Sequence, residues 1–424
     1  MIDIKLLRAG PQKFKDAAAA KRIGVDIDAL LDLDSRLLKA RQEMQDIRTA
    51  QNVAGKEIAT LKGDEKQAAV AKMAQLKARA KELSDVVEEL EPKFNELMLL
   101  VPQPAATEVP LGKDDTENVV LRVEGAVPNF AFEPKDHMQL GEMLDIIDVP
   151  RGVKLAGSRN YFLKGAGALL HQAILRLAVE QMVAKGYTFM TVPVLVNESV
   201  MYGTGYFPVG RDQAYLAERD NMSLVGTAEV PVTAYHTDEI LDEATLPRKY
   251  VAMSTCFRRE AGAAGKDTYG LYRIHLFDKV EQVILCRNDE QESIRLHQEI
   301  LKNAEDVLRA LELPYRVVNV CTGDLGQGQV QKFDIETWMP SRKSYGETHS
   351  ASRFYEFQAR RLNLRYRDAE GKVQYCHTLN NTVIASPRIL IPVLEMYQNA
   401  DGTVTVPKAL RPFMMGIEKI EPRS

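Results

Sequence analysis

Apolar residues recur at alternating spacings of three and four between residues 27 and 100, which is the clearest hydrophobic pattern in the chain. The first run is Leu30, Leu33, Leu37, Ala40, Met44, Ile47, Gln51, Ala54, Ile58 and Leu61, and Gln51 is its one polar member. The second run is Ala69, Met73, Leu76, Ala80, Leu83, Val87, Leu90, Phe94 and Leu97. Such spacing places apolar side chains along one stripe of a helix, and a turn at residues 62–64 separates the runs. The pattern predicts two helices, each about 50 Å long at 1.5 Å per residue, packed as a helical hairpin over 27–100.

Charge is spread unevenly along this hairpin. Residues 36–81 carry eleven Lys or Arg and five Asp or Glu, whereas residues 82–100 carry one and six. Long coiled coils generally carry many charges, so a solvated surface and a polyanion-binding surface both fit the composition. The concentration of positive charge in one half slightly favours polyanion binding.

A proline-rich stretch without hydrophobic period follows at residues 101–118 and predicts an extended linker. We therefore expect an N-terminal domain at 1–105 and a second domain at 106–424. Within the second domain, strand-like runs alternate irregularly with helical stretches, which predicts an α+β fold with an antiparallel or mixed sheet. The strand-like runs are 189–196, 279–285 and 315–320, and the helical stretches lie near 166–185 and 288–311.

Composition narrows the class of protein. The chain has 424 residues, 45% of them hydrophobic and 27% charged, so it is long enough for two domains and too apolar to be disordered. With a formal net charge of -4, any nucleic acid would have to bind at a local basic patch. The four cysteines form no CxxC pair, which predicts buried free thiols instead of a disulfide framework or a zinc site. No signal peptide or membrane span is recognisable, so the expected location is the cytoplasm.

Arginines and carboxylates are concentrated between Cys256 and Glu281, where the pattern predicts a strand, a glycine-bearing loop and a second strand. Because alternate residues of a strand share a face, Arg258 and Glu260 would point the same way while the loop closes over a ligand. An exposed charged hairpin explains the same residues. The chain contains no GxGxxG, GxxxxGKS/T, HExxH or GxSxG sequence, so nucleotide binding would need a different cradle.

These residues carry a family resemblance. Residues 257–262 (FRREAG) followed by 273–281 (RIHLFDKVE) closely resemble motif 2 of class II aminoacyl-tRNA synthetases, in the form found in seryl-tRNA synthetases. In the family's order, 226–231 (GTAEVP) resembles its serine-binding TxE loop, 347–361 its metal and ATP segment, and 378–388 its motif 3. The helical hairpin resembles the family's N-terminal domain, so the resemblance covers essentially the whole chain. The sequence departs from the commonest bacterial pattern at Arg259, where serine is frequent, and at 381–387, which replace a glycine-rich run.

The resemblance implies a class II catalytic domain built on an antiparallel sheet, preceded by a long antiparallel coiled-coil arm. It implies a ligase that activates L-serine with ATP to seryl-adenylate and transfers serine to the 3′ end of tRNA(Ser), with tRNA(Sec) as a second candidate acceptor. It also implies a homodimer, whose interface would be built by motif 1, here the helix near 166–185 and the strand through Pro193. No membrane contact is expected.

The same resemblance assigns catalysis to Arg258 and Arg388. Arg258 would contact the α-phosphate and the serine carboxylate, and Arg388 the far phosphate of a bent ATP, because a guanidinium fork matches paired oxygens. Glu260 would bind the adenine amino group, the backbone near Ile274 would contact the base, and Phe277 would stack on it. The implied ATP-binding residues are Arg258, Arg259, Glu260, Ile274, Phe277, Glu347, Thr348, His349, Ser350 and Arg388. Glu347 and Ser350 would also be oxygen ligands for Mg²⁺, and no zinc is expected.

The implied serine-binding residues are Thr227, Ala228, Glu229, Arg258, Glu281, Asn380 and Thr382. A pocket that must hydrogen-bond the substrate hydroxyl leaves its own polar groups unpaired with alanine, and selectivity can then reach the order of 10⁴. Simpler explanations remain for parts of this set. Glu281 could pair structurally with Lys279 or Arg273, residues 380–382 could form a plain turn, and Pro387 could start the last long helix.

In the resembling family the arm lies along the long variable arm of tRNA and recognises its shape and backbone. On the charge distribution, the candidate phosphate contacts are Arg48, Lys56, Lys62, Lys66 and Lys72. Two other functions were weighed. An amino acid:carrier-protein ligase would usually lack the arm, and an inactive tRNA-binding paralogue would have lost charged residues that are all in place here.

Overall fold

The computed structural model describes residues 1–58, 60–262 and 269–422. The chain divides into two compact units, one of Ile2–Pro102 and one of Met1 with Gln103–Ser424. The units meet at residues 102 and 103, within the predicted linker and three residues before the predicted domain boundary. Residues 263–268, part of the predicted glycine-bearing loop, lie outside the described residues.

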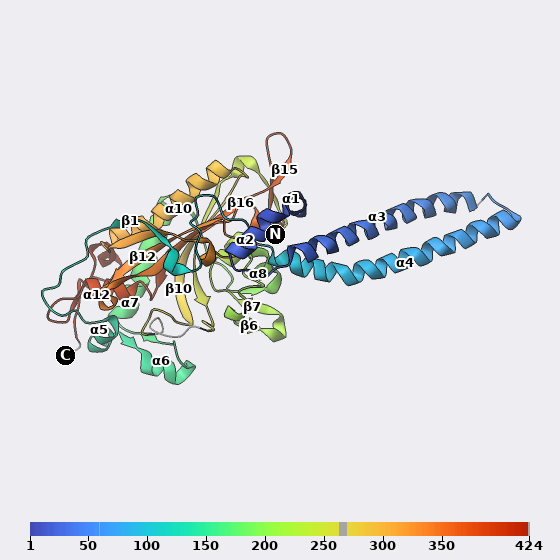
Figure 1. The fold of residues 1–424 in the computed structure, drawn as a ribbon. Helices are drawn as coiled ribbons and strands as arrows, with labels where there is room; N and C mark the ends of the chain where they lie inside the picture. The colour runs from blue at the N-terminus through green and yellow to red at the C-terminus, as the bar shows by residue number, and fades with distance from the viewer. Residues whose placement is uncertain (59, 263–268, 423–424) are drawn as a thin grey trace. The chain divides into compact units, whose positions relative to one another are not determined.

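The N-terminal unit contains the helical hairpin. Its helices are α1 (Ile4–Ala9), α2 (Pro11–Ala20), α3 (Ile27–Ile58) and α4 (Gly63–Leu100). Figure 1 shows α3 and α4 side by side along their length. Every residue of the two predicted apolar runs is buried or half-buried, with Ala40, Ile47 and Leu83 at the centre of their contact. The predicted hairpin is confirmed, because the 3,4 spacing turns these side chains toward the partner helix.

The second unit, which we call the catalytic unit because the resemblance places the catalytic domain there, is built around an eight-stranded sheet within the described part of the chain. The strand order is β1-β11-β12-β13-β16-β10-β9-β4, and its pairs are antiparallel except for β4 with β9. The strands are β1 (Val119–Glu124), β4 (Thr188–Met190), β9 (Arg248–Phe257), β10 (Leu276–Cys286), β11 (Tyr315–Asn319), β12 (Gln331–Met339), β13 (Ser344–Arg353) and β16 (His377–Ser386). The predicted α+β class with an antiparallel-dominated sheet is confirmed.

Helices and smaller sheets surround this sheet (Figure 1). The helices are α5 (His137–Met143), α6 (Val149–Ala156), α7 (Ala166–Ala184), α8 (Glu198–Thr204), α9 (Glu229–Thr233), α10 (Glu290–Ala310), α11 (Phe357–Leu362) and α12 (Leu390–Met396). The remaining strands are β2 (Ile147–Asp148), β3 (Phe162–Leu163), β5 (Leu195–Asn197), β6 (Leu216–Ala217), β7 (Met222–Leu224), β8 (Ile240–Asp242), β14 (Arg365–Arg367), β15 (Val373–Tyr375), β17 (Val404–Thr405) and β18 (Lys419–Ile420).

Helices α7 and α10 contact each other and both pack on β10 and β16, so they cover one face of the sheet. Val280 and Ile284 of β10 point into the main hydrophobic core on that face. Because side chains alternate along a strand, Lys279 and Glu281 point to the opposite face. The polar face of β10 is therefore the face on which a ligand can lie.

Three local expectations are corrected. The predicted strand 189–196 is split into β4 and β5, which belong to different sheets, with Pro193 between them; a proline has no N–H to donate to a strand ladder. Residues 380–382 lie inside β16 and are not a turn. The last helix begins at Leu390, not at Pro387, and has seven residues.

The four cysteines, Cys256, Cys286, Cys321 and Cys376, are buried free thiols within the described residues, as predicted. Burial raises the pKa of the Cys376 thiol to about 12 and also raises the pKa of Cys256 and Cys286. In the described ranges no helix combines the length and the apolar character that crossing a membrane requires.

Candidate active site

One pocket of the catalytic unit collects most of the predicted site residues. It lies on the polar face of the sheet, where β9, β10, β13 and β16 are neighbours. Fourteen of the sixteen residues predicted to bind serine, ATP or metal line it. They are Thr227, Glu229, Arg258, Glu260, Ile274, Phe277, Glu281, Glu347, Thr348, His349, Ser350, Asn380, Thr382 and Arg388. Thr227 and Arg388, which are 161 residues apart in the chain, thus line the same pocket.

Two predicted residues do not line this pocket. Ala228 is fully buried in a second hydrophobic cluster with Val232 and Val283, because its small apolar side chain packs at the start of α9. Arg259 is exposed, and its guanidinium donates to the carbonyl of Asp212 at 3.2 Å. The residue between Arg258 and Glu260 points away from the face that those two share.

The inner end of the pocket is a compact group of opposite charges. Lys279 is buried, and its Nζ lies 2.5 Å from Oε2 of Glu281 and donates to Oγ1 of Thr227 at 2.7 Å. Thr382 Oγ1 donates to the same Glu281 oxygen at 3.4 Å. The structural ion pair between Glu281 and Lys279, which the sequence offered as an alternative to a binding role, is therefore present. Both residues nevertheless line the pocket, so the pair does not exclude a binding role for Glu281.

Glu229 lies beside this group in a site that disfavours its charge. Burial, and then the negative charge of Glu281, raise the pKa of Glu229 to about 7, while a hydrogen bond from Gln358 at 2.7 Å opposes the shift. A carboxyl with such a pKa exchanges a proton near neutral pH. The inner end can therefore accommodate a cation, because Glu229 and Glu281 both favour one.

Arg258 occupies the middle of the pocket. Its Nε donates to the carbonyl of Gly226 at 3.3 Å, and its guanidinium carbon lies 5.2 Å from the centre of the Phe277 ring. Glu260, the predicted adenine contact, is buried and forms an ion pair of 2.5 Å with Arg273. The sequence suggested that Arg273 could pair with Glu281, but in the structure Arg273 pairs with Glu260.

Arg388 occupies the outer end. Its Nε donates to the carbonyl of Tyr272 at 2.9 Å, its Nη1 to the carbonyl of Glu347 at 3.0 Å, and it stacks 4.4 Å from the centre of the Tyr272 ring. These contacts involve Nε and Nη1 and hold the guanidinium at the pocket, which Arg388 lines. The pocket is thus lined by two arginines, Arg258 and Arg388, whose guanidinium groups suit phosphate oxygens.

The oxygen donors predicted for a metal also lie together. Desolvation acts to raise the pKa of Glu347, but Arg388, Lys332 and Arg258 outweigh it and hold that pKa below its ordinary value, so the carboxylate is ionised. Ser350 lies on the same strand, β13, and also lines the pocket. Two hard oxygen donors beside an open pocket fit Mg²⁺, which keeps several waters and takes further ligands from substrate phosphates. In the described part of the chain no three His, Cys, Asp or Glu side chains form a metal-binding group.

Thr348 and His349 line the pocket while their side chains bond within the sheet. The Thr348 hydroxyl lies 2.7 Å from that of Thr337 and 2.8 Å from Nδ1 of His349. Burial lowers the pKa of His349 to about 3, so the ring is neutral and adds no positive charge to the site.

Six residues that line the pocket were not among the functional candidates, and two of them, Lys279 and Tyr272, contact predicted residues. Lys279 was considered only as a structural partner of Glu281, although its position two residues from both Phe277 and Glu281 places it on their face. Tyr272 was given no role, yet its ring and carbonyl hold Arg388. Strand alternation could have found Lys279, whereas the Tyr272 contact joins segments 116 residues apart and has no local signal.

The candidate phosphate contacts of the arm are all exposed. Arg48 and Lys56 lie on α3, Lys62 precedes α4, and Lys66 and Lys72 lie in the first turns of α4. Farther from this end, Arg41 pairs with Glu91 and Arg79 with Glu43 across the two helices. The candidate contacts near the tip thus face solvent, while Arg41 and Arg79, nearer the base, form interhelical ion pairs.

Comparison with known proteins covers both units. Residues 1–104 match the family model of the seryl-tRNA synthetase N-terminal domain, and residues 215–397 match that of the tRNA synthetase class II core domain (G, H, P, S and T). The serine–tRNA ligase of Deinococcus radiodurans is 43% identical over 99% of this chain and 98% of its own length. That of Symbiobacterium thermophilum is 41% identical over 99% of this chain and all of its own.

Solved structures of seryl-tRNA synthetases are also similar to this chain. A seryl-tRNA synthetase from Pyrococcus horikoshii, complexed with ATP, superposes with a TM-score of 0.93 at 37% identity, over the full length of both chains. A cytoplasmic serine–tRNA ligase from Naegleria fowleri, in complex with AMP, superposes with a TM-score of 0.87 at 27% identity, over 100% of this chain and 99% of its own.

Proposed function

The chain belongs to the seryl-tRNA synthetase family and is a serine–tRNA ligase, and from this premise we propose how the residues of its pocket divide the reaction. In the first step a carboxylate oxygen of serine attacks the α-phosphorus of ATP. The bond from that phosphorus to the bridging oxygen breaks, which gives seryl-adenylate and pyrophosphate. The attacking carboxylate is already ionised at neutral pH, so the step needs positioning and charge neutralisation instead of a general base.

Arg258 supplies both the positioning and the charge neutralisation at the reacting atoms. It binds the serine carboxylate and the α-phosphate together and brings the attacking oxygen to the phosphorus. Its contacts with the Gly226 carbonyl and the Phe277 ring support this role, because they fix the guanidinium before substrate arrives. Phe277 offers its ring to the adenine, and Glu260 its carboxylate to the adenine amino group. Arg388, held by Tyr272, binds the far phosphate and stabilises the departing pyrophosphate.

Serine binds at the inner end of the pocket. Its hydroxyl is recognised by Glu281, Thr382 and Asn380, and its ammonium by Thr227, Glu229 and Glu281. Lys279 lies among these groups, and we propose that it joins the serine carboxylate or the α-phosphate when the substrate ammonium takes its place. The ion pair of 2.5 Å between Lys279 and Glu281 supports this exchange, since it shows that the carboxylate already accommodates one ammonium.

ATP is the nucleotide substrate, and Mg²⁺ its proposed companion. Glu347 and Ser350 would hold the ion, which when bound neutralises phosphate charge and stabilises the leaving pyrophosphate. In the second step a ribose hydroxyl at the 3′ end of tRNA attacks the seryl carbonyl and AMP leaves. Serine is thereby esterified to tRNA(Ser).

The single observation that carries this proposal is the convergence of Arg258, Glu281, Glu347 and Arg388 on one pocket. Exchange of labelled pyrophosphate into ATP tests it, with Mg²⁺ and without tRNA, using serine, threonine, alanine and glycine in turn. Exchange with serine alone is expected. Absence of exchange with every amino acid would support the inactive paralogue, and exchange favouring alanine or glycine the carrier-protein ligase.

We propose that the enzyme acts as a homodimer through α7 and β4. β4 is an edge strand of the large sheet, and the apolar side chains of Val183 and Phe189 are 49% and 44% exposed there. An open edge beside exposed apolar residues is a surface that a second copy can cover. Sedimentation velocity should give about twice the mass of 47.5 kDa; a monomer at micromolar concentration would contradict the assignment.

We propose that the arm binds tRNA through its exposed basic tip. The triple variant Lys62→Ala, Lys66→Ala, Lys72→Ala should weaken tRNA(Ser) binding and reduce the slope of log K against log salt by about two to three, because each phosphate contact releases about one counterion. Serine-dependent exchange without tRNA should be unchanged. The matched control is Lys93→Ala near the base of the arm, where Lys93 pairs with Glu89. An unchanged salt slope in the triple variant would rule out these lysines as phosphate contacts.

A further inference from the structure

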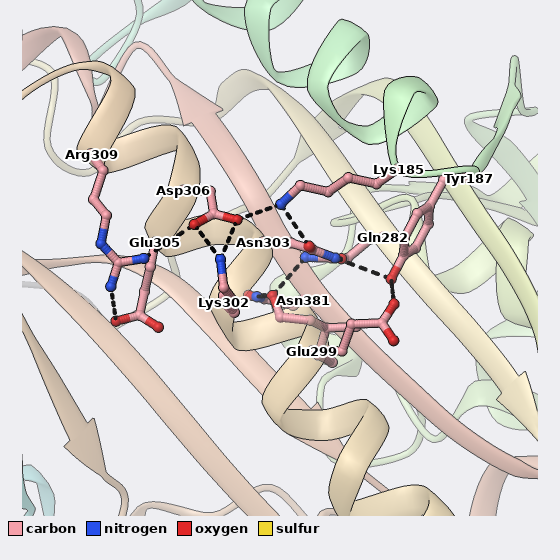
Figure 2. A network of polar contacts seen from close by, with 11 residues as sticks. Lys185, Tyr187, Gln282, Glu299, Lys302, Asn303, Glu305, Asp306, Arg309 and Asn381 are labelled. Atoms are coloured by element: carbon pink, nitrogen blue, oxygen red, sulfur yellow. Dashed lines mark hydrogen bonds and ion pairs between the residues drawn. The ribbon is translucent and has the colours of Figure 1, made fainter.

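Polar side chains are buried directly behind the serine end of the pocket. Gln282 of β10 and Asn381 of β16 are fully buried and lie opposite each other in the strand pairing. Both side-chain amides donate to one acceptor, the carbonyl oxygen of Ile300 in α10, at 2.9 and 2.5 Å. Figure 2 shows these amides converging beneath the helix. The two pocket strands are therefore tied to the same point of α10.

Asn303, three residues farther along α10, extends this contact. Its Nδ2 donates to Oε1 of Gln282 at 2.9 Å and to the hydroxyl of Tyr187 at 3.2 Å, and its Oδ1 accepts from Nζ of Lys185 at 2.8 Å (Figure 2). Lys185 caps the C-terminus of α7, and Tyr187 immediately precedes β4. We call Lys185, Tyr187, Gln282, Asn303, Asn381 and the Ile300 carbonyl the Asn303 network. It uses every hydrogen-bonding atom of the Asn303 amide group.

The serine-recognition residues occupy the alternate positions of the same two strands. Glu281 precedes Gln282, and Asn380 and Thr382 flank Asn381, so they emerge on the pocket face while the network residues point to α10. The pairing of β10 with β16 shifts by one residue between Val280 and Glu281, which is a β-bulge. The bulge thus lies directly at the serine-recognition residues.

At the bulge, the register of β10 against β16 depends on side-chain contacts. It interrupts the ladder of backbone hydrogen bonds, and a slip of one residue would turn Thr382 away from the pocket. Apolar packing is non-directional and would tolerate small displacements of the strands. Hydrogen bonds are directional, and two amides that share one carbonyl hold both strands at a defined distance and register.

We propose that Asn303, Gln282 and Asn381 are positioning residues for serine selectivity: they fix β10 against β16 at the bulge and so set the spacing of Glu281, Asn380 and Thr382. This inference rests on the proposed serine pocket. It assigns to α10, which touches no substrate, a part in discriminating serine from alanine. It further implies that the ATP end of the pocket, formed by Arg258 and Arg388, is insensitive to the network.

Asn303→Asp is the sharpest test. The aspartate keeps an oxygen acceptor for Lys185 but replaces the donor to Gln282 with a second acceptor, so two oxygens face each other. We expect the KM for serine in pyrophosphate exchange to rise about tenfold and the ratio of serine to alanine kcat/KM to fall by at least tenfold, since displacements near 1 Å can cost that much or more. The KM for ATP should stay within about twofold.

Lys302→Met is the matched control, because Lys302 is the neighbouring residue of α10 in Figure 2 and forms an exposed ion pair with Asp306. Such pairs contribute little, so serine KM and selectivity should be unchanged. A purely structural role of Asn303 predicts a lower melting temperature with unaltered selectivity, and this result would overturn the proposal.

Gln282→Glu provides a second test if Asn303→Asp fails to fold. It keeps the acceptor for Asn303 and replaces the donor to Ile300 with an oxygen, and the same loss of selectivity is expected. An unchanged serine-to-alanine ratio in this variant would refute the proposal. Absence of serine-dependent exchange in the unmodified enzyme would instead refute the proposed function, so the two failures are distinguishable.

Discussion

Replacing Arg258 with lysine is expected to slow serine-dependent pyrophosphate exchange by about 10²–10³-fold, the range found when a preorganised donor to developing charge is removed. Lysine keeps the positive charge but loses the planar fork that can bind a carboxylate and a phosphate together. It also loses the bond to the Gly226 carbonyl and the contact with the Phe277 ring that hold the group in place. The measurement is kcat for exchange at saturating serine and ATP.

Arg259→Lys is the matched control. It makes the same change at the adjacent residue, whose side chain is exposed and bonded to the Asp212 carbonyl. Its exchange rate should stay within about twofold of the unmodified enzyme, in line with surface substitutions generally. A comparable loss in both variants would mean that Arg259 reaches ATP when substrate binds, as the sequence predicted.

Glu281→Gln is expected to lower kcat/KM for serine by about 10²–10⁴ while changing the KM for ATP little. The amide has the same shape but cannot pair with Lys279 or attract the substrate ammonium. Because the loss falls on serine recognition, activity with alanine should decline much less, and the serine-to-alanine ratio should collapse. Equal losses with both amino acids would show that Glu281 has a general structural role instead.

Glu229→Gln should be milder and should depend on pH in a defined direction. With a pKa raised to about 7, mainly by burial, Glu229 is protonated in a large share of molecules at neutral pH. Below pH 7 the variant therefore resembles the unmodified enzyme, and above pH 7 it lacks a carboxylate that the enzyme has gained. The ratio of variant to unmodified kcat/KM should fall as the pH rises from about 6 to about 8. A ratio independent of pH would contradict this role of the Glu229 carboxyl.

The arm was predictable because its structure is local. Each apolar position between Leu30 and Leu97 follows from a spacing of three or four, and each is buried or half-buried in the hairpin. The prediction of one strand at 189–196 was wrong for a reason that is visible in the sequence. Pro193 has no N–H to donate to the hydrogen bonds in the middle of a strand. Its division between two sheets, however, depends on partners far away in the chain.

Most residues of the site could be predicted from the sequence, but their contacts with one another could not. The motifs identified Arg258, Glu281 and Arg388 by resemblance, and strand alternation from Phe277 and Glu281 would have added Lys279. Arg259 lies outside the pocket, where its guanidinium bonds to the carbonyl of Asp212, and this contact between segments 47 residues apart has no local signal. The Asn303 network could not be predicted from the sequence, because its members come from α10, β10, β16 and the segment between α7 and β4, and they meet only in the folded sheet.

The four buried cysteines allow local opening of this enzyme to be followed by thiol labelling. All four belong to the catalytic unit, and residues 2–102 contain none. Thiol reagents attack the thiolate, which burial disfavours here, so labelling of the native enzyme must await local opening. Labelling rates therefore report on the catalytic unit alone. A single Lys62→Cys substitution would add an accessible thiol to the arm tip, so that tRNA docking and opening of the active-site unit could be followed separately in one molecule.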